Sequence, residues 1–372
     1  MNRLYAGLVL ASAFLVLVLA ACAPSNASTG APAQAPTLAP AATQASSASP
    51  QSFTVLVGGH DNANAADIEA YFPSTIRVHV GDTVVWKLNT SELHTVTFLA
   101  GEQAPALLQP VPQAPPGAMM FNPQVAFPQM PKDGQYDGSS FANSGVMSRD
   151  PGQAQEFKLT FTKAGSYPYT CIVHGEEKMN GTVVVEDASV AIPSQAADDA
   201  EGKKELAALK AQVPAAVQAA QAQIKPDQKN PDGTTTHFVV TGYSQGPIDL
   251  EDYYPNKLTA RPGDTVTWVL GQGDIAPHTI TFLNGATEPA MISPQPQPNG
   301  PPLLLVNPAV GAPQNADQPL TNKGVYSSGI IDPHAPGAHS FSLKIGNTLG
   351  DLAYHCILHD DSGMKGSITI AQ

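Results

Sequence analysis

The sequence has few charged residues and a clear shortage of positive ones. Charged residues are 13% of the 372 residues, and 18 Lys and Arg face 31 Asp and Glu, so the formal net charge is −13. So acidic a chain is poorly suited to bind nucleic acid or an anionic lipid surface. Low charge combined with 35 Pro and 31 Gly favours a β-rich extracytoplasmic protein over a helical cytosolic one.

Long apolar runs are also missing, except near the N-terminus. After Arg3, the stretch from Ala6 to Ala21 is almost wholly apolar and ends in LAAC, Leu19 to Cys22. It is shorter than the about 20 residues that a membrane-spanning helix needs, and it is typical of a signal peptide. LAAC resembles a bacterial lipobox, which implies cleavage before Cys22 and a lipid on its thiol; the alternative is an ordinary secretory signal with a chance cysteine.

We therefore predict a lipoprotein signal peptide over residues 1–21, followed by a flexible tether over residues 22–50. The tether is rich in Ala, Pro, Ser, Thr and Gln, and Leu38 is its only large apolar residue. Such a segment cannot bury a core. The expected location is extracytoplasmic, with the protein lipid-anchored to the cell membrane through Cys22, in the periplasm or at the cell surface.

The remaining sequence consists of two copies of one unit. YFPSTIRVHVGDTVVW, from Tyr71, matches YYPNKLTARPGDTVTW, from Tyr253, and HTVTFLAG, from His94, matches HTITFLNG, from His278. Such similarity predicts one domain over residues 51–187 and a second over residues 234–372. Between them, an Ala-rich stretch interrupted at Pro214 predicts a partly helical linker over residues 188–233; a disordered linker is the alternative.

Within each copy the apolar residues recur with the period of a β-strand. Phe157, Leu159 and Phe161 alternate with polar residues. The same alternation recurs in the second copy at Phe341, Leu343 and Ile345. With Gly-Asp turns between short strands, this pattern predicts an all-β fold with an antiparallel sandwich in each copy. Each copy also has a long loop rich in Pro, Gln and Met, and loops of this length are usually functional or flexible.

Cysteine is scarce, yet it occurs twice in the same motif. Besides Cys22 there are Cys171 and Cys356, each followed by a histidine three residues on and a methionine five residues beyond it. Because side chains alternate along a strand, each cysteine and the upstream histidine are expected to face the core from strand ends. The predicted metal ligands are His94, Cys171, His174, Met179, His278, Cys356, His359 and Met364. A buried inert thiol is the alternative for a single cysteine, and the duplication argues against it.

The types of ligand indicate the metal. Two imidazoles, one thiolate and one thioether form a soft set, and a His2Cys arrangement with a long axial Met is the blue-copper pattern. Structural zinc usually has more cysteines or a carboxylate. We therefore predict two type 1 copper ions, one per domain.

Each copy resembles a cupredoxin. C-x2-H-x4-M, which begins at Cys171 and Cys356, is the plastocyanin-type ligand loop, and a histidine lies upstream in an HTVTF-like strand. The resemblance covers residues 53–186 and 236–371. It implies two tandem Greek-key β-sandwiches, each binding one copper and carrying single electrons. Thr95 and Thr279 depart from the pattern, because plastocyanin commonly has there an Asn that ties the ligand loops together.

A copper enzyme is a less favoured hypothesis, and we predict no catalytic residue. Four protein ligands leave no open position for a substrate. Oxygen-reducing copper clusters share His-x-His pairs, and this sequence contains none. Copper nitrite reductases have a histidine directly before the copper cysteine, as His355 is before Cys356, but Thr170 takes that place in the first copy. A copper-binding or delivery protein of the cell envelope is a further alternative.

The loops beside the predicted coppers are acidic, with Glu176 and Glu177 in one copy and Asp360 and Asp361 in the other. Electron-transfer partners commonly meet through charge-steered interfaces. We expect a redox partner with a basic patch, such as a cytochrome or a membrane electron-transfer complex; simple solvation of the loops is the alternative.

Overall fold

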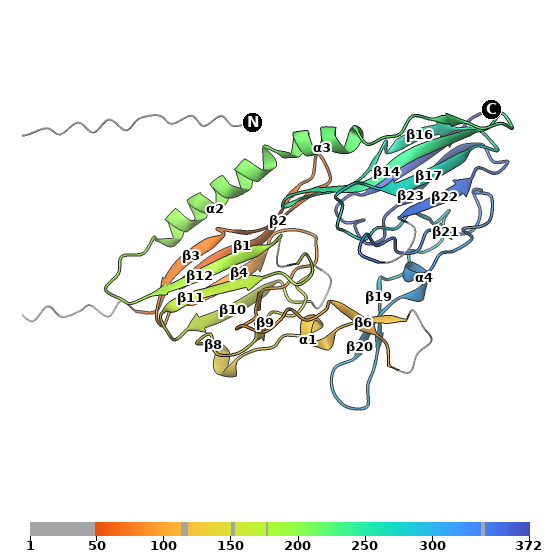
Figure 1. Ribbon diagram of the computed structural model, residues 1–372. Coiled ribbons are helices and arrows are strands. Elements are labelled where there is room, and N and C mark those ends of the chain that lie inside the picture. Colours follow the sequence, from red (N-terminus) through yellow and green to blue (C-terminus); the bar gives the residue numbers. More distant parts are fainter. Residues whose placement is uncertain (1–48, 113–117, 150–152, 176–177, 336–338) are drawn as a thin grey trace, which may run out of the picture. The chain divides into compact units, whose positions relative to one another are not determined.

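The computed structural model describes residues 49–112, 118–149, 153–175, 178–335 and 339–372. The predicted signal peptide, the lipidation at Cys22 and nearly all of the predicted tether lie outside the described residues. The described chain is built mainly of β-strands in several sheets (Figure 1), which confirms the predicted all-β class. Among the residues described, no helix is both long and apolar enough to cross a membrane.

The first repeat folds into two facing sheets. One sheet contains β1 (Ser52–Asp61), β2 (Ala66–Phe72), β4 (Thr83–Leu88), β10 (Glu156–Phe161) and β8 (Gln135–Tyr136). The other has the order β3 (Thr75–His79), β12 (Asn180–Glu186), β11 (Gly165–Thr170), β5 (Thr97–Phe98) and β9 (Ala142–Asn143). A short helix, α1 (Pro123–Ala126), and the 3-10 turn η1 (Lys132–Gly134) lie in the long loop.

The second repeat has the same arrangement. Its first sheet contains β14 (Thr235–Gln245), β15 (Ile248–Tyr254), β17 (Thr265–Leu270) and β22 (Ser340–Lys344), with β13 (Gln228–Lys229) paired to β14. Its second sheet has the order β16 (Lys257–Ala260), β24 (Lys365–Ile370), β23 (Gly350–His355), β18 (Thr281–Phe282) and β21 (Tyr326–Ser327). The helix α4 (Pro308–Gly311) corresponds to α1.

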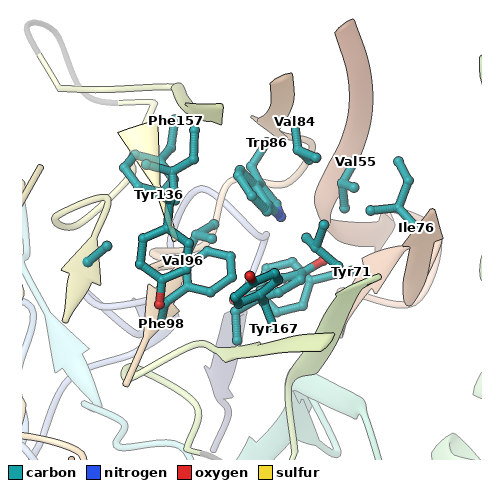
Figure 2. Close-up of a cluster of buried hydrophobic side chains, with 14 of the residues drawn as sticks. Val55, Tyr71, Ile76, Val84, Trp86, Val96, Phe98, Tyr136, Phe157 and Tyr167 are labelled. Atoms are coloured by element: carbon teal, nitrogen blue, oxygen red, sulfur yellow. The ribbon is translucent and has the colours of Figure 1, made fainter. Parts of the chain in front are cut away.

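The two sheets of each repeat enclose an apolar core, as the period-two pattern predicts. In β10 the residues Phe157, Leu159 and Phe161 are buried while their neighbours are more exposed. Trp86 packs edge-on against Phe98, with ring centroids 5.6 Å apart (Figure 2). This aromatic core gives the sandwich a rigid interior beneath the predicted ligands.

The two repeats share one ten-stranded sheet, because β2 pairs antiparallel with its own counterpart β15. The N–H of Glu69 donates to the carbonyl of Pro247, and the N–H of Glu251 donates to that of Ala65, each at 2.7 Å. Two corresponding strands that would otherwise be sheet edges therefore cover each other.

The linker covers one face of this joint with two helices, α2 (Gln195–Lys210) and α3 (Val213–Gln221), and so is partly helical as predicted. Ser194 caps α2, and Pro214 lies in the first turn of α3, where its missing N–H has no cost. Alternation along β2 and β15 turns their apolar residues toward the helices, where Val213 and Ala216 share a core with Ile68, Leu250 and others. The acidic residues between them face the opposite side.

The two long loops form a further sheet instead of remaining irregular. β6 (Leu108–Pro110) and β7 (Met119–Phe121) come from the first repeat, and β19 (Ile292–Gln295) and β20 (Leu303–Val306) come from the second. Leu305 pairs with Met120, so that the order is β19-β20-β7-β6. The repeats are thus joined at two separate places.

Candidate metal centre

In the first repeat, the structure brings three of the predicted ligands together. Cys171 directly follows β11 and is fully buried, while His94 forms an isolated bridge with Met147 just before β5. Cys171 Sγ lies 3.8 Å from Nδ1 of His94 and 3.5 Å from Nδ1 of His174. We call these three residues and Met179 site 1.

The second repeat reproduces this arrangement as site 2. Cys356 directly follows β23 and is fully buried. Its Sγ lies 3.9 Å from Nδ1 of His278 and 3.5 Å from Nδ1 of His359, and the two Nδ1 atoms are 3.1 Å apart. Met364 completes site 2.

The methionines lie at the closing end of each ligand loop. Met179 and Met364 are both fully buried. The N–H of Cys171 donates to the carbonyl of Met179 at 3.0 Å, and that of Cys356 donates to Met364 at 3.1 Å. Each loop is therefore closed by a backbone hydrogen bond between its cysteine and its methionine, which fixes the relative position of these two residues.

The spacing of the donor atoms fits a shared metal ion. Three ligands evenly arranged around one ion, with bonds of about 2.0 Å to nitrogen and about 2.3 Å to sulfur, would be about 3.5 to 3.7 Å apart. The observed nitrogen–sulfur and nitrogen–nitrogen separations run from 3.1 to 3.9 Å. In site 2 only a small adjustment would let all three atoms bind one ion. In site 1 the three donor atoms lie within 4.8 Å of one another, and Glu69 Oε2 lies 3.7 Å from Nδ1 of His94 and 2.8 Å from Nδ1 of His174.

Thr95 and Thr279 connect the ligand strands by hydrogen bonds, although plastocyanin commonly has an asparagine at this position. The Thr95 N–H donates to Cys171 Sγ at 3.3 Å, and its hydroxyl accepts the N–H of Ile172 at 2.8 Å. In site 2 the distances to Cys356 and Ile357 are the same, 3.3 and 2.8 Å. A hydrogen bond to a metal-binding sulfur tunes the electron density that it offers.

Two glycines make room for the upstream histidines, and sequence reasoning missed them. Gly58 and Gly242 have φ angles of +73° and +65°, which few other residues adopt. A Cβ at Gly58 would lie 2.7 Å from Nε2 of His94, and one at Gly242 would lie 2.2 Å from Nε2 of His278. The bulge in each first strand therefore brings its backbone directly against a predicted ligand.

Buried carboxylates distinguish the two sites, and these were also missed. Glu69 Oε2 lies 2.8 Å from Nδ1 of His174, whereas the corresponding Glu251 has its Oε1 3.9 Å from Nε2 of His359. In site 2, Asp274 Oδ2 lies 3.0 Å from Nε2 of His278. The sequences of β2 and β15, ADIEAYF and IDLEDYY, alternate acidic with apolar residues, and this pattern could have indicated the buried glutamates.

These carboxylates give the histidines different proton affinities. Burial and the neighbouring His174 hold the pKa of His94 well below its usual range. Burial also disfavours the charged form of His278, but Asp274 overcomes this effect and the pKa of His278 rises to about 10. Burial opposes ionisation of Cys356, yet His359 and His278 hold the pKa of this thiol well below its usual range, which favours the thiolate that binds metals.

His355, the residue relevant to the nitrite-reductase alternative, is surrounded by carboxylates. Its Nε2 lies 3.1 Å from Glu288 Oε2, and Asp360 lies in the same cluster. Among the residues that the structure describes, no further histidine joins this cluster. Of the acidic loop residues, Asp360 is paired with Lys365 at 3.1 Å, while Glu176 and Glu177 lie outside the described residues.

Part of the chain is similar in sequence to known copper-binding proteins. Residues 59–186 match the family described as copper binding proteins, plastocyanin/azurin family. Plastocyanin from Nostoc punctiforme is 26% identical over 137 residues, which are 36% of this chain and 73% of that protein.

Solved structures of amicyanin variants are also similar. One in the oxidised state has 24% identity, covers 36% of this chain and 82% of its own, and gives a TM-score of 0.22. Another, in the Cu(I) form, has 24% identity, and the match covers 38% of this chain and 89% of the amicyanin chain with a TM-score of 0.21.

Proposed function

We propose that this chain is a membrane-anchored blue copper protein with two type 1 sites, and the match of residues 59–186 to the plastocyanin/azurin family of copper-binding proteins supports this proposal. It would carry single electrons between extracytoplasmic redox partners. The observation that carries the proposal is the duplicated triangle of two Nδ1 atoms and one Sγ atom, which is buried in site 2 and largely buried in site 1. The same donor set is present in both repeats, although the family match covers only the first.

Each group at the sites has a role in this proposal. The thiolates of Cys171 and Cys356 would couple the metal electronically to the protein, and the histidines would set the geometry. Met179 and Met364 would tune the reduction potential as weak axial ligands. The rigid aromatic core and the threonine hydrogen bonds hold these groups in place, so that little rearrangement accompanies gain or loss of an electron.

Copper content and visible absorption test this proposal directly. The soluble chain that begins after Cys22 is expected to bind two copper ions and to show an intense thiolate-to-copper band. Cys171→Ser and Cys356→Ser should each remove one copper and about half of the band, if each copper has one thiolate ligand. A colourless protein, or two coppers retained in the double variant, would rule out the electron-carrier function and leave copper binding or delivery.

We extend the proposal to the location of the protein. The motif that ends at Cys22 supports export and lipid attachment, with the protein held in the periplasm or at the cell surface. Cys22→Ser should release the protein from the membrane fraction while leaving its copper content unchanged. Membrane retention of this variant would exclude the lipid anchor.

A redox partner with a basic patch, such as a cytochrome or a membrane electron-transfer complex, is part of the proposal. Asp361 is exposed beside site 2, and the net charge is −13. Association should therefore slow as the salt concentration increases, because exposed charges are screened within about 10 Å at 0.1 M salt. An association rate that does not change with salt would exclude charge steering.

A further inference from the structure

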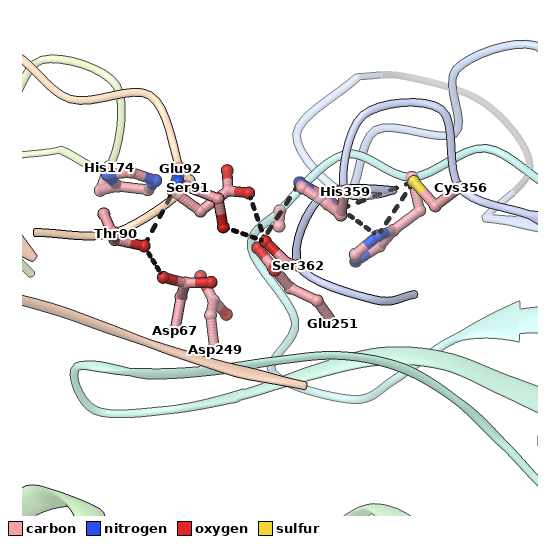
Figure 3. Close-up of polar contacts among 12 residues, drawn as sticks. Asp67, Thr90, Ser91, Glu92, His174, Asp249, Glu251, Cys356, His359 and Ser362 are labelled. Carbon is pink, nitrogen blue, oxygen red and sulfur yellow. Dashed lines mark hydrogen bonds and ion pairs between the residues drawn. The ribbon is translucent and has the colours of Figure 1, made fainter. Parts of the chain in front are cut away.

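The ligand loops of the two sites are in direct contact. Glu92 precedes His94 of site 1 by two residues, and Ser362 lies between His359 and Met364 of site 2. The Ser362 hydroxyl donates to Glu92 Oε1 at 2.9 Å (Figure 3). The hydroxyl of Ser91 is also 3.2 Å from that of Ser362.

We propose that the two copper sites exchange electrons with each other through this contact, an inference that rests on the proposed function. One electron leaves the reduced site and enters the oxidised site, with no proton moved and no bond made or broken. The first electron is supplied by the external redox partner. The nearest redox partner of each site is then the other half of the same chain.

The contact provides a defined route. Electronic coupling falls steeply with the length of the path and most steeply across gaps between atoms. From His94 the route follows the backbone to Glu92, crosses one hydrogen bond to Ser362, and reaches His359 along the loop. It contains a single non-covalent step.

The residues that make the contact are largely shielded from water, although Asp361 in the same loop is exposed. Glu92 is 9% exposed, Ser362 4% and His359 6%. The His174 side chain is 11% exposed. An external protein therefore has little access to the ring of His359, whereas the ligand loop of the other repeat already contacts its loop.

Two independent joints hold the route at constant length. The β2–β15 pair closes the sheet beside it, and the β7–β20 pair joins the long loops. Glu251, on β15, and Glu92 both approach His359, close enough for the three to form one buried cluster. A hinge between the repeats would break these pairings.

A cross-link in metal-free protein tests the geometry. In a Cys171→Ser/Cys356→Ser background that begins after Cys22, Ser91→Cys with Ser362→Cys should form a disulfide upon mild oxidation, because the two hydroxyls are 3.2 Å apart. Ser91→Cys with Ser340→Cys is the matched control, since Ser340 is exposed on β22. Failure of the first pair to cross-link would overturn the inference.

Pulse reduction of the copper-loaded chain tests the transfer itself. With less than one electron injected per chain and Met364→Leu used to separate the two bands, one band should recover as the other fades, at a rate independent of protein concentration. Ser362→Ala should slow this phase at least tenfold, whereas Glu92→Gln keeps an oxygen that accepts the hydrogen bond and should preserve the rate.

The outcomes separate the two proposals. A chain without two blue coppers would fail as an electron carrier. Two blue coppers with a rate proportional to protein concentration would exclude internal transfer and leave the carrier function intact. An unchanged rate in Ser362→Ala would exclude the assigned route.

Discussion

Asp67 and Asp249 lie directly opposite each other in the antiparallel pair of β2 and β15, and both side chains are buried. Each accepts a hydrogen bond from a hydroxyl, Thr90 for Asp67 and Ser244 for Asp249. Lys178 Nζ is 3.9 Å from Asp249, too far for a hydrogen bond. The joint between the repeats therefore places two acidic side chains opposite each other, each with one basic group near it, His60 at Asp67 and Lys178 at Asp249.

Asp249→Asn should stabilise the protein. The amide oxygen can still accept from Ser244, and like charges at opposite positions cost about 0.2–1 kcal/mol. We expect the free energy of unfolding in urea at pH 7 to rise by about 0.5–1 kcal/mol. Asp187→Asn, at an exposed position, is the charge-matched control; an equal gain there would attribute the effect to net charge instead.

Thr95→Ala should destabilise the first repeat. It removes the hydroxyl that accepts the buried N–H of Ile172, and an unpaired buried donor costs about 1–3 kcal/mol. Thr95→Ser keeps the hydroxyl and should retain most of the stability in the same urea titration. If Ser and Ala behave alike, the hydrogen bond has no role and the loss comes from the methyl group.

Gly58→Ala should displace His94. The new Cβ would lie 2.7 Å from His94 Nε2, and φ is +73°, so strain and crowding together should cost roughly 2–5 kcal/mol. Gly101→Ala has φ +86° but meets nothing within 4 Å, and it should cost only roughly 1–2 kcal/mol. Thermal unfolding and copper content would be measured on both; normal copper binding in Gly58→Ala would contradict the close approach.

His60 should make stability depend on pH. Its Nδ1 lies 2.9 Å from Asp67 Oδ2, and this hydrogen bond raises the pKa of His60 against the opposing effect of burial. A raised histidine pKa gives stability that is complete below the unfolded value, about 6.5, and is lost as the pH rises through the folded value. His60→Gln should thus lose more stability at pH 6 than at pH 9. A pH-independent difference would show that the pair carries no charge.

Glu69→Gln should raise the reduction potential of site 1 alone. Burial raises the pKa of Glu69 to about 7, so Glu69 is ionised at pH 9. Its carboxylate lies beside His174, and a nearby negative charge favours the more highly charged oxidised metal. Its removal should shift the potential of site 1 upward on the order of 100 mV. Redox titration of the two bands at pH 9 measures this, with the exposed Glu102→Gln as the control. Equal shifts at both sites would contradict a local effect.

The sandwich and the grouping of the donor atoms were predictable because their signals are local and duplicated. Tyr167, Tyr169 and Cys171 occupy alternate positions along β11 and directly after it, so the inward direction of the thiol follows from strand periodicity even though Thr170 is buried as well. A loop of fixed spacing then places His174 near that thiol whatever the rest of the chain does.

The joint between the repeats was not predictable in the same way. The pairing of strand edges depends on contacts between residues nearly two hundred positions apart. From its sequence alone, β2 would be predicted to be an edge strand with Asp67 and Glu69 exposed to water. The strand pairing of Met120 with Leu305 has no local signal either, because each belongs to a loop rich in proline and polar residues. Glu69 could be recognised beside His174 only once the fold placed them together.

Pairing of a strand with its own counterpart is how a symmetric dimer meets around its twofold axis. Here Asp67 faces Asp249 as a residue faces its own copy across such an axis, but both partners are encoded in one chain. A true homodimer must repeat every substitution in both subunits. Covalent fusion removes that constraint, because each repeat can change independently. In this chain the two sites differ: a carboxylate contacts His174 in site 1, and another contacts His278 in site 2.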